Sequence, residues 1–324
     1  MSAAPLVSIC IPTYNGAPWI EGALRSALAQ EYAPLEVVVV DDASTDATLE
    51  VVGRFDDPRL RVERNPRNVG LVRNWNRAVG HARGELVKLL FQDDLLHPRC
   101  VPEMAAVIRE HPSVGMVFSR REVLLDEPDD PRSQAWKREY GVLDTQFERL
   151  GRINRGRDLF EQYLRRRFRV NMVGEPTCVL VRSEVFRRLG RFNARLHQGC
   201  DFEMWIRIMA YYDVGFLEQE LASFRYHPGS TTSANHRTNR PWLDMLWLIE
   251  GLLRHPEIRR DYPQIARQRP VEWLRVLRAE LRRARRGMPF PFREHARDFA
   301  AYWQYRSLRR AGREPDLHSE DGEL

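Results

Sequence analysis

The chain has 324 residues, of which 43% are hydrophobic and 10% aromatic, so it can build a packed core and is not disordered throughout. Its formal net charge of +6 suits anionic partners such as nucleotides, nucleic acid or a membrane surface, without choosing among them. The four cysteines are scattered and form no C-x-x-C pair, which indicates neither a disulfide framework nor a zinc site. We therefore expect a globular protein of a reducing compartment.

Short β-rich runs alternate with helical patterns through the first 120 residues. The clearest strand is 35–40, where four consecutive valines favour an extended segment covered on both faces. Strands are expected at 6–11, 35–40, 59–64, 85–91 and 114–119, with helices near 18–30, 70–82 and 99–110. This alternation predicts an α/β fold with a doubly wound, mostly parallel sheet, in which ligands bind beyond the carboxyl ends of the strands.

The rest of the chain is less regular. Residues 120–155 contain the charged, proline-punctuated stretch "DEPDDPRSQAWKREYG", which predicts a loop or a mobile flap. Helices are then expected at 156–168, 183–190 and 200–212, and strands at 176–182 and 214–227. Beyond residue 240 the chain is rich in arginine and patterned as helix, so we expect a helical C-terminal extension.

No segment of the sequence is typical of export or membrane insertion. The N-terminus lacks the basic region and the long apolar stretch of a signal peptide. No run reaches the roughly 18 apolar residues of a membrane span, and "WLDMLWLIEGLL" is interrupted by Asp244 and Glu250. We expect a cytoplasmic protein with at most a peripheral contact at the inner face of the membrane, made by the C-terminal basic helices.

Three polar motifs each follow a predicted strand: "PTYN", "DDASTD" and "QDD". They should therefore meet at one edge of the sheet. The adjacent carboxylates of Asp93 and Asp94 need a positive partner there, because like charges repel and burial disfavours both. Three explanations compete: a helix N-cap with ion-pair partners, a basic side chain such as Arg73 or Lys88, or a divalent cation held by hard oxygen ligands.

Taken together, the motifs resemble a known family. "SICIPTYNGAPWIEGALRSALAQEYAPLEVVVVDDASTDAT", "NVGLVRNWNRAVGHARGELVKLLFQDDLLHP", "DFEMWIRI" and "LASFRYHPGSTT" are similar in order and spacing to the family 2 glycosyltransferases of the GT-A fold. The resemblance is close over residues 6–120 and resumes in 201–232. It implies transfer of a sugar, with inversion, from a UDP-, dTDP- or GDP-linked donor to a saccharide or lipid-linked acceptor, assisted by Mn²⁺ or Mg²⁺ and serving bacterial surface polysaccharide or glycoconjugate synthesis.

This resemblance also implies a division of the chain and a set of donor-binding residues. Residues 1–120 would form the donor-binding half, 121–239 the acceptor-binding half with the catalytic base, and 240–324 the helical extension. The "PTYN" loop would cradle the nucleotide, and Asp42 would contact its base. The implied donor-binding residues are Pro12, Thr13, Tyr14, Asn15, Asp42, Asn68, Arg73 and Asp93. An ordinary strand-ending turn for "PTYN" and a surface helix position for Arg73 are the alternatives.

The acidic pair matches the family's metal-and-donor motif, D-x-D, although Gln92 stands at its first position. We expect Asp94 to bind the cation and Asp93 to contact the donor ribose or a metal-bound water. His227 falls where related enzymes offer a side chain to the metal or the diphosphate, and a neutral imidazole suits Mn²⁺ better than Mg²⁺. A purely structural role is the alternative for His227.

The segment "CDFEMWIRI" resembles the part of the family that supplies the catalytic base, and Asp201 takes that position. Cys200 stands where many members carry an additional acid, which leaves Glu203 as a second candidate. Alternatively, Asp201 only caps the helix that follows it.

Two other functions stay open at this point. Acids at a sheet edge also suit a metal-dependent nucleotidyltransferase, which would release pyrophosphate rather than a nucleoside diphosphate. The basic helix "LRVLRAELRRARR" is compatible with a non-catalytic module that binds a membrane surface or, less in keeping with the motifs, nucleic acid. The absence of a G-x-G-x-x-G after the first strand disfavours a nicotinamide-binding protein.

Overall fold

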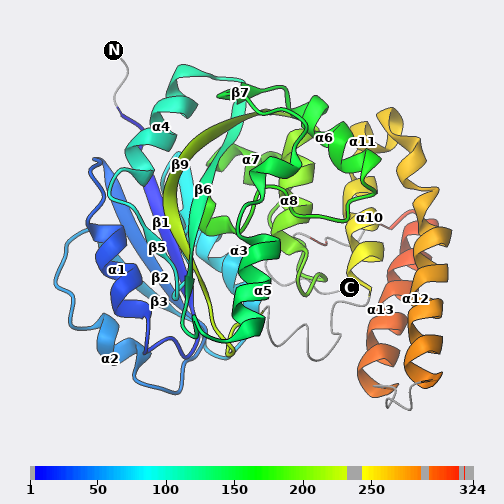
Figure 1. Ribbon diagram of the computed structural model, residues 1–324, viewed down its shortest axis with the longest axis horizontal. Helices are drawn as coiled ribbons and strands as arrows, with labels where there is room; N and C mark the ends of the chain where they lie inside the picture. Colours follow the sequence, from blue (N-terminus) through cyan, green and yellow to red (C-terminus); the bar gives the residue numbers. More distant parts are fainter. Residues whose placement is uncertain (1–3, 232–242, 286–291, 314–316, 318–324) are drawn as a thin grey trace.

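The computed structural model describes residues 4–231, 243–285, 292–313 and 317. A twisted central sheet lies between helices, and a helical extension follows at one end of the molecule (Figure 1). The strands are β1 (Val7–Thr13), β2 (Leu35–Asp41), β3 (Leu60–Arg64), β4 (Leu86–Leu89), β5 (Leu95–Leu96), β6 (Val114–Leu125), β7 (Ile153–Asn154), β8 (Val179–Arg182) and β9 (Asp213–Tyr226). Their order across the sheet is β3-β2-β1-β4-β8-β6-β9-β5, with β7 paired to β9.

The strands from the first ninety residues form the parallel part of the sheet. β2 pairs in parallel with β1 and β3, and β1 pairs in parallel with β4. The valines of β2 are buried on both faces: Val38 and Val40 belong to one core cluster, whereas Val37 and Val39 belong to the other. Burying each such side chain stabilises the fold by about 1.5–3 kcal/mol. The predicted α/β fold with a mostly parallel central sheet is confirmed.

Helices cover both faces of the sheet. They are α1 (Ile20–Leu28), α2 (Thr48–Val52), α3 (Leu71–His81), α4 (Cys100–Glu110), α5 (Pro131–Tyr140), α6 (Gly156–Arg165), α7 (Ser183–Leu189), α8 (Cys200–Met209), α10 (Asp244–Arg254), α11 (Pro256–Asp261), α12 (Gln268–Arg285) and α13 (Phe292–Arg310). Short 3₁₀ helices lie at Asp144–Gln146, Pro176–Cys178 and Pro263–Ile265. Apolar side chains of α1, α2 and α4 share one core cluster, and those of α3, α6, α7, α8 and α10 share the other.

Two strands from later in the chain change the pattern beyond β4. β8 inserts between β4 and β6 and is antiparallel to both. β9 then runs parallel to β6 along nearly its whole length, with register shifts near Ser119 and Arg120. As a result, the end of β9 reaches the loop that follows β4, where the backbone N–H of Arg225 donates to Asp94 Oδ1 at 2.9 Å.

The segment 120–155 is more ordered than its composition predicts. β6 continues to Leu125, and α5 occupies much of the charged stretch. The Asp130 side chain accepts a hydrogen bond from the backbone N–H of Arg132 at 3.2 Å, and Pro131 stands at the first helical position. An aspartate followed by proline is a helix start, so the expectation of a loop or flap was wrong over Pro131–Tyr140.

The C-terminal helices pack against the same core as the sheet. α10 is apolar on most of its surface, and Glu250 in its middle is buried. The Glu250 carboxylate accepts hydrogen bonds from side chains of α12 and α13, namely Arg269, Tyr302, Arg306 and Arg309, at 2.7–3.1 Å. Burial alone would raise the pKa of Glu250, but the arginines hold it below its usual value. In the part of the chain that the structure describes, no helix is both long and apolar enough to cross a bilayer.

Candidate functional site

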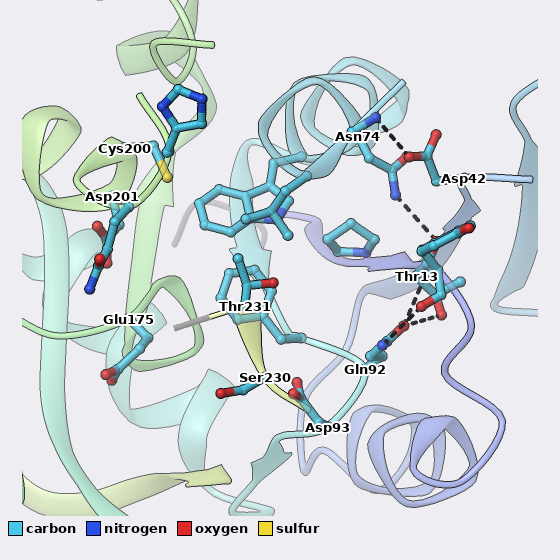
Figure 2. A pocket seen from close by; sticks show the side chains of 18 of the residues that line it. Thr13, Asp42, Asn74, Gln92, Asp93, Glu175, Cys200, Asp201, Ser230 and Thr231 are labelled. Atoms are coloured by element: carbon cyan, nitrogen blue, oxygen red, sulfur yellow. Dashed lines mark hydrogen bonds between the residues drawn. The ribbon is translucent and has the colours of Figure 1, made fainter. Parts of the chain in front are cut away.

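A cavity of about 410 Å³ opens at the carboxyl ends of β1, β2 and β4 (Figure 2). This volume lies within the range of small-molecule sites in proteins. The lining includes Pro12, Thr13, Tyr14, Asp42, Asn68, Gly70, Gln92, Asp93, Glu175, His197, Cys200, Asp201, Arg225, Ser230 and Thr231. The three polar motifs predicted to meet at this edge of the sheet all contribute to it.

Gln92 connects the loop after β1 with the loop after β4. Thr13 Oγ1 donates to Gln92 Oε1 at 2.6 Å, and the backbone N–H of Tyr14 donates to the same oxygen at 2.9 Å. Gln92 Nε2 in turn donates to the Tyr14 carbonyl at 3.2 Å. Gln92 therefore braces the "PTYN" loop. Asn15 is absent from the lining that the structure describes; its backbone N–H donates to Ser44 Oγ, which ties the loop to the segment after β2.

Asp42 organises the turn that leads into α3. Its carboxylate accepts hydrogen bonds from Asn65 Nδ2 at 2.8 Å and from the backbone N–H groups of Val69 and Gly70 at 2.9 and 3.0 Å. Gly70 has a φ of +89°, which disfavours any side chain, and it lines the cavity beside Asn68. Arg73, one turn into α3, is not among the lining residues in the described ranges.

The two adjacent acids have different surroundings. Asp94 is 1% exposed, and its carboxylate accepts hydrogen bonds from Thr177 Oγ1 at 2.6 Å and from the backbone N–H of Arg225. Burial and the neighbouring Asp93 charge raise the pKa of Asp94 well above the usual range. Asp93 instead lines the cavity, whereas Asp94 is outside the lining in the described part of the chain. Lys88, a candidate partner for the pair, donates to the Thr177 carbonyl instead.

His227 lies directly beside Asp93. Its Nε2 is 3.1 Å from Asp93 Oδ2, and its ring contacts Trp19 with the centroids 4.4 Å apart. The end of β9 positions both residues. His227 directly follows this strand, and the Arg225 guanidinium donates to the backbone carbonyl of Asp93 at 3.0 Å. The structure thus joins a carboxylate and an imidazole that are 134 residues apart in the chain.

Asp201 stands at the start of α8 on the opposite wall of the cavity from Thr13 and Asp42 (Figure 2). Its Oδ1 accepts the backbone N–H of Phe202 at 2.7 Å, and its Oδ2 accepts Asn171 Nδ2 at 3.1 Å. Burial of the carboxylate raises the pKa of Asp201 to about 7, although these two hydrogen bonds act in the other direction. A carboxyl group that titrates near neutral pH and faces a cavity is suited to accept a proton.

The other candidates around Asp201 have different roles. Glu203 is fully buried, with its Oε2 3.0 Å from Arg207 Nη2, and it lies outside the described cavity lining. Cys200 lines the cavity, and burial raises the pKa of its thiol, which keeps it protonated. Trp205 is 1% exposed and its Nε1 donates to the Gly174 carbonyl at 2.9 Å, so this side chain packs in the core.

The segment 171–178 contributes residues of the candidate site that the sequence did not reveal. Asn171 holds Asp201, as described above, and its own Oδ1 accepts the backbone N–H groups of Val173 and Gly174. At the other end of the segment, Thr177 donates to Asp94. One short stretch thus contacts both acidic motifs. An acid before proline inside the apolar run "MVGEPTCVLV" was the available signal.

Glu175, in the middle of that segment, is a further carboxylate that lines the cavity (Figure 2). It pairs with Arg121, whose side chain is 4% exposed and whose guanidinium binds both Glu175 oxygens. Arg121 Nη1 donates to the Gly141 carbonyl, and Nη2, which also binds Glu175, donates to the Tyr140 carbonyl, both at 3.0 Å. These hydrogen bonds fix the position of Arg121, which in turn orients the Glu175 carboxylate in the cavity wall.

The chemistry of these side chains is compatible with a divalent cation at one place. Asp93 lines the cavity, and His227 lies directly beside it although outside the described lining; together they offer an oxygen and a nitrogen ligand. Mg²⁺ and Mn²⁺ sites often use only one or two protein ligands and take the rest from phosphates and water. No group of three or more His, Cys, Asp and Glu side chains suited to hold a metal occurs among the described residues. These two protein ligands therefore fit a cation whose remaining coordination positions are filled by a bound phosphate and water.

Comparisons with known proteins bear on the family and the fold of the chain. The family model for "Glycosyl transferase family 2" matches residues 8–190. An uncharacterised protein of Mycobacterium tuberculosis is 36% identical over 251 residues, which is 76% of each chain. Hyaluronan synthase of Pasteurella multocida is 42% identical over 103 residues, which is 31% of this chain and only 10% of that protein.

Two solved structures share the fold. S. aureus TarS 1-349, in complex with UDP-GlcNAc, superposes with a TM-score of 0.62 at 18% identity, over 95% of this chain and 92% of that one. The mannosyltransferase PcManGT from Pyrobaculum calidifontis, in complex with GDP-Man and Mn²⁺, gives 0.55 at 21% identity, over 96% and 84%. These likenesses establish a GT-A-like fold for the chain.

Proposed function

This chain belongs to glycosyl transferase family 2 and is a glycosyltransferase, and from that premise we propose that it transfers a sugar from a nucleoside-diphosphate donor to a hydroxyl group by in-line displacement. One observation carries the proposal: Thr13, Asp93 and Asp201 line a single cavity. The loop proposed to bind the nucleotide, the carboxylate proposed to lie near the diphosphate and the proposed proton acceptor therefore face the same space. Direct attack by the hydroxyl would invert the anomeric carbon, because the leaving group departs from the opposite side.

We propose that the nucleotide occupies the end of the cavity formed by the loops after β1 and β2. Pro12, Thr13 and Tyr14 line this end, and Asp42 orders the turn that carries Asn68 and Gly70. The donor would be a UDP-, dTDP- or GDP-linked sugar; the likeness to TarS with UDP-GlcNAc and to PcManGT with GDP-Man supports the UDP- and GDP-linked classes. Asn15 would act indirectly, because the hydrogen bond from its backbone N–H to Ser44 supports the loop.

A divalent cation would be held by Asp93 and His227, and when bound it would neutralise the charge that develops on the departing diphosphate. This assignment differs from the roles expected from the sequence, in which Asp94 was the cation ligand. The hydrogen bonds from Thr177 and Arg225 to Asp94 favour Asp93 as the cation ligand, because they already engage the Asp94 carboxylate in holding the loop. The Mn²⁺ in PcManGT supports the choice of metal.

Asp201 would accept the proton of the attacking hydroxyl. It lines the cavity, Asn171 orients its carboxylate, and its pKa of about 7 lies close to the optimum for a base at neutral pH. Glu203 is a poor alternative because it is buried and ion-paired with Arg207. Cys200 supplies no second charge, and the pKa of Asp201 is raised mainly by burial, with a smaller contribution from the charge of Glu175.

We propose that Glu175 binds hydroxyl groups of the transferred sugar. Its carboxylate is fixed by Arg121 and faces the same cavity as Asp201. Two carboxylates on one wall accept hydrogen bonds from hydroxyls but repel a carboxylate on the ligand. The donor sugar would therefore be neutral or basic, and not a uronic acid.

The acceptor would be a saccharide or a lipid-linked saccharide in bacterial surface polysaccharide or glycoconjugate synthesis. The similarity of part of the chain to hyaluronan synthase supports a polysaccharide pathway. We also propose a cytoplasmic location, which the four free thiols support, since free cysteines are usual in a reducing compartment.

Thermal stabilisation by nucleotide sugars tests the proposal. With Mn²⁺ present, the correct donor at a hundred times its Kd should stabilise the fold by about 2.7 kcal/mol. A product assay on that donor should then detect the nucleoside diphosphate. Pyrophosphate released from a nucleoside triphosphate would favour a nucleotidyltransferase instead. If no UDP-, dTDP- or GDP-sugar stabilises the protein, the proposed donor site is wrong.

A further inference from the structure

An exposed apolar face on α12 has no role in the cavity chemistry. Val271, Leu274, Leu277 and Leu281 recur at intervals of three and four residues, so they lie on one side of the helix. Their exposed fractions are 39–57%, which is unusual for aliphatic side chains. The opposite side of α12 packs inward, and it includes Glu272, which is 3% exposed.

The neighbouring helix enlarges this face. Phe299 and Trp303 are one turn apart on α13 and are 44% and 43% exposed. Trp273 of α12 contacts both, with ring centroids 5.6 and 6.0 Å away. Six of the ten exposed large hydrophobic side chains in the described ranges therefore lie on α12 and α13, which stand side by side at the end of the molecule (Figure 1). We call these six side chains and Trp273 the apolar face.

Most of the charges around the apolar face are positive. α12 contains six arginines and two glutamates, and Glu272 is buried and ion-paired with Arg169. On the helix surface, Arg278 lies between the leucines, and Arg275 and Arg282 lie along one edge, all of them exposed. Leucines bordered by arginines, with aromatic rings nearby, are the pattern of a helix that lies in the headgroup region of a membrane.

We propose that the apolar face docks on an anionic lipid bilayer. The leucines and Trp303 would enter the boundary between headgroups and acyl chains, and the arginines would extend to lipid phosphates while their stems stay in the apolar layer. The charge selects this occupant over a second copy of the chain, because a symmetric pairing would bring like-charged arginines together. The exposed leucines disfavour nucleic acid, which offers no apolar surface to cover them.

The two helices α12 and α13 are attached firmly to the rest of the molecule, so docking them on a membrane would also orient the rest of the molecule. Glu250 of α10 binds Arg269 of α12, and it also binds Tyr302, Arg306 and Arg309 of α13. This buried cluster fixes the helix pair to the body that carries the cavity. A docked apolar face would therefore hold the whole enzyme at the membrane in one orientation, and this holds whether or not the proposed donor chemistry is correct.

Flotation of the full-length protein with lipid vesicles tests the inference. The protein should float with vesicles of phosphatidylcholine plus phosphatidylglycerol, and much less with phosphatidylcholine alone. The double variant Leu274→Ser/Leu281→Ser should lose more than about tenfold in vesicle affinity. As a matched control, Val62→Ser/Val142→Ser removes side chains that are 44% and 57% exposed elsewhere, and it should bind as the wild type does.

The arginines provide a second, independent arm. Arg278→Gln/Arg282→Gln should weaken binding by about fivefold for each arginine, and added salt should weaken the wild type more than this variant. For the unmodified protein, vesicles that contain brominated lipid should quench tryptophan fluorescence, and Trp303→Phe should reduce that quenching. This measurement needs no variant of the leucines and stays valid if the leucine variant fails to fold.

Three results would overturn the inference. The first is a wild-type protein that neither floats with the anionic vesicles nor is quenched by the brominated lipid. The second is a folded leucine variant, judged by circular dichroism, that floats as well as the wild type. The third is a dimer in light scattering that the leucine variant dissociates, which would assign the apolar face to self-association.

Discussion

Replacing the proposed base Asp201 by asparagine separates its role in catalysis from its effect on the free energy of unfolding. Folding raises the pKa of Asp201 from 3.8 to about 7, which at 1.36 kcal/mol for each pH unit corresponds to about 4 kcal/mol. The carboxylate is partly exposed to the cavity, so water screens part of this destabilisation. We therefore expect the ionised Asp201 to destabilise the fold by about 2–3 kcal/mol. Asp201→Asn removes the penalty but loses the hydrogen bond from Asn171, which costs about 1 kcal/mol.

The variant should therefore be more stable than the wild type above pH 7, by about 1–2 kcal/mol. The sign depends on pH: the folded protein binds the extra proton, so wild-type stability is highest below pH 3.8 and falls as the pH rises to about 7. Near pH 5 most of the penalty is absent, and the two proteins should be nearly equal. At about 2.1 cal/mol/K per residue, the gain at pH 8 corresponds to a Tm increase of about 1.5–3 °C.

Two assays on the same protein check this prediction. Turnover, measured as release of the nucleoside diphosphate, should fall by about 10²–10⁴ in Asp201→Asn. Calorimetric melting at pH 5 and pH 8 should show the stability gain only at pH 8. The surface variant Glu50→Gln should change neither quantity, since that side chain is 71% exposed. Turnover close to the wild type, or a variant less stable at pH 8 than at pH 5 relative to the wild type, would refute the reasoning.

The other predictions concern the same cavity. Turnover of the wild type should fall below about pH 7 and level off above it, because only the deprotonated Asp201 accepts a proton; a profile without a step near neutral pH would exclude this residue as the base. Asp93→Asn should weaken Mn²⁺ binding in the presence of a nucleoside diphosphate by at least about tenfold in calorimetry, whereas Asp94→Asn should not. The reverse result would restore the roles expected from the sequence. Glu175→Gln should raise the KM for the nucleotide sugar by about tenfold and leave the Kd of the free nucleoside diphosphate unchanged; equal losses in both would place Glu175 in a structural role.

The parallel part of the fold could be predicted from the sequence because its residues allow few alternatives. The valines at 37–40 are all β-branched, so they favour a strand, and a run without polar residues requires cover on both faces. Each polar motif then follows a strand directly, which places all three at one edge of the sheet. The same local rule did not hold for residues 120–155, where a capped helix start at Asp130 and Pro131 outweighed a charged composition.

The different surroundings of Asp93 and Asp94 could not be predicted, because they depend on contacts with distant parts of the chain. The two carboxylates are adjacent in sequence and chemically identical. Asp94 is turned inward by Thr177, which is 83 residues away, and by Arg225, which is 131 residues away. These partners meet it only because β8 inserts beside β4 and β9 runs along β6. No pattern within the motif indicates which acid is the buried one.

The same long-range packing explains why both halves of the proposed reaction depend on the segment 171–178. Asn171 orients Asp201, Thr177 holds Asp94 in the loop that carries Asp93, and Glu175 lies between these two contacts. Arg121 anchors the middle of the segment through an almost fully buried guanidinium. A displacement of the segment would therefore move the base and the phosphate-side loop together, and a misplacement of about 1 Å can cost a hundredfold in rate. Such coupling requires a rigid support, and the Arg121–Glu175 pair supplies one at the wall of the cavity.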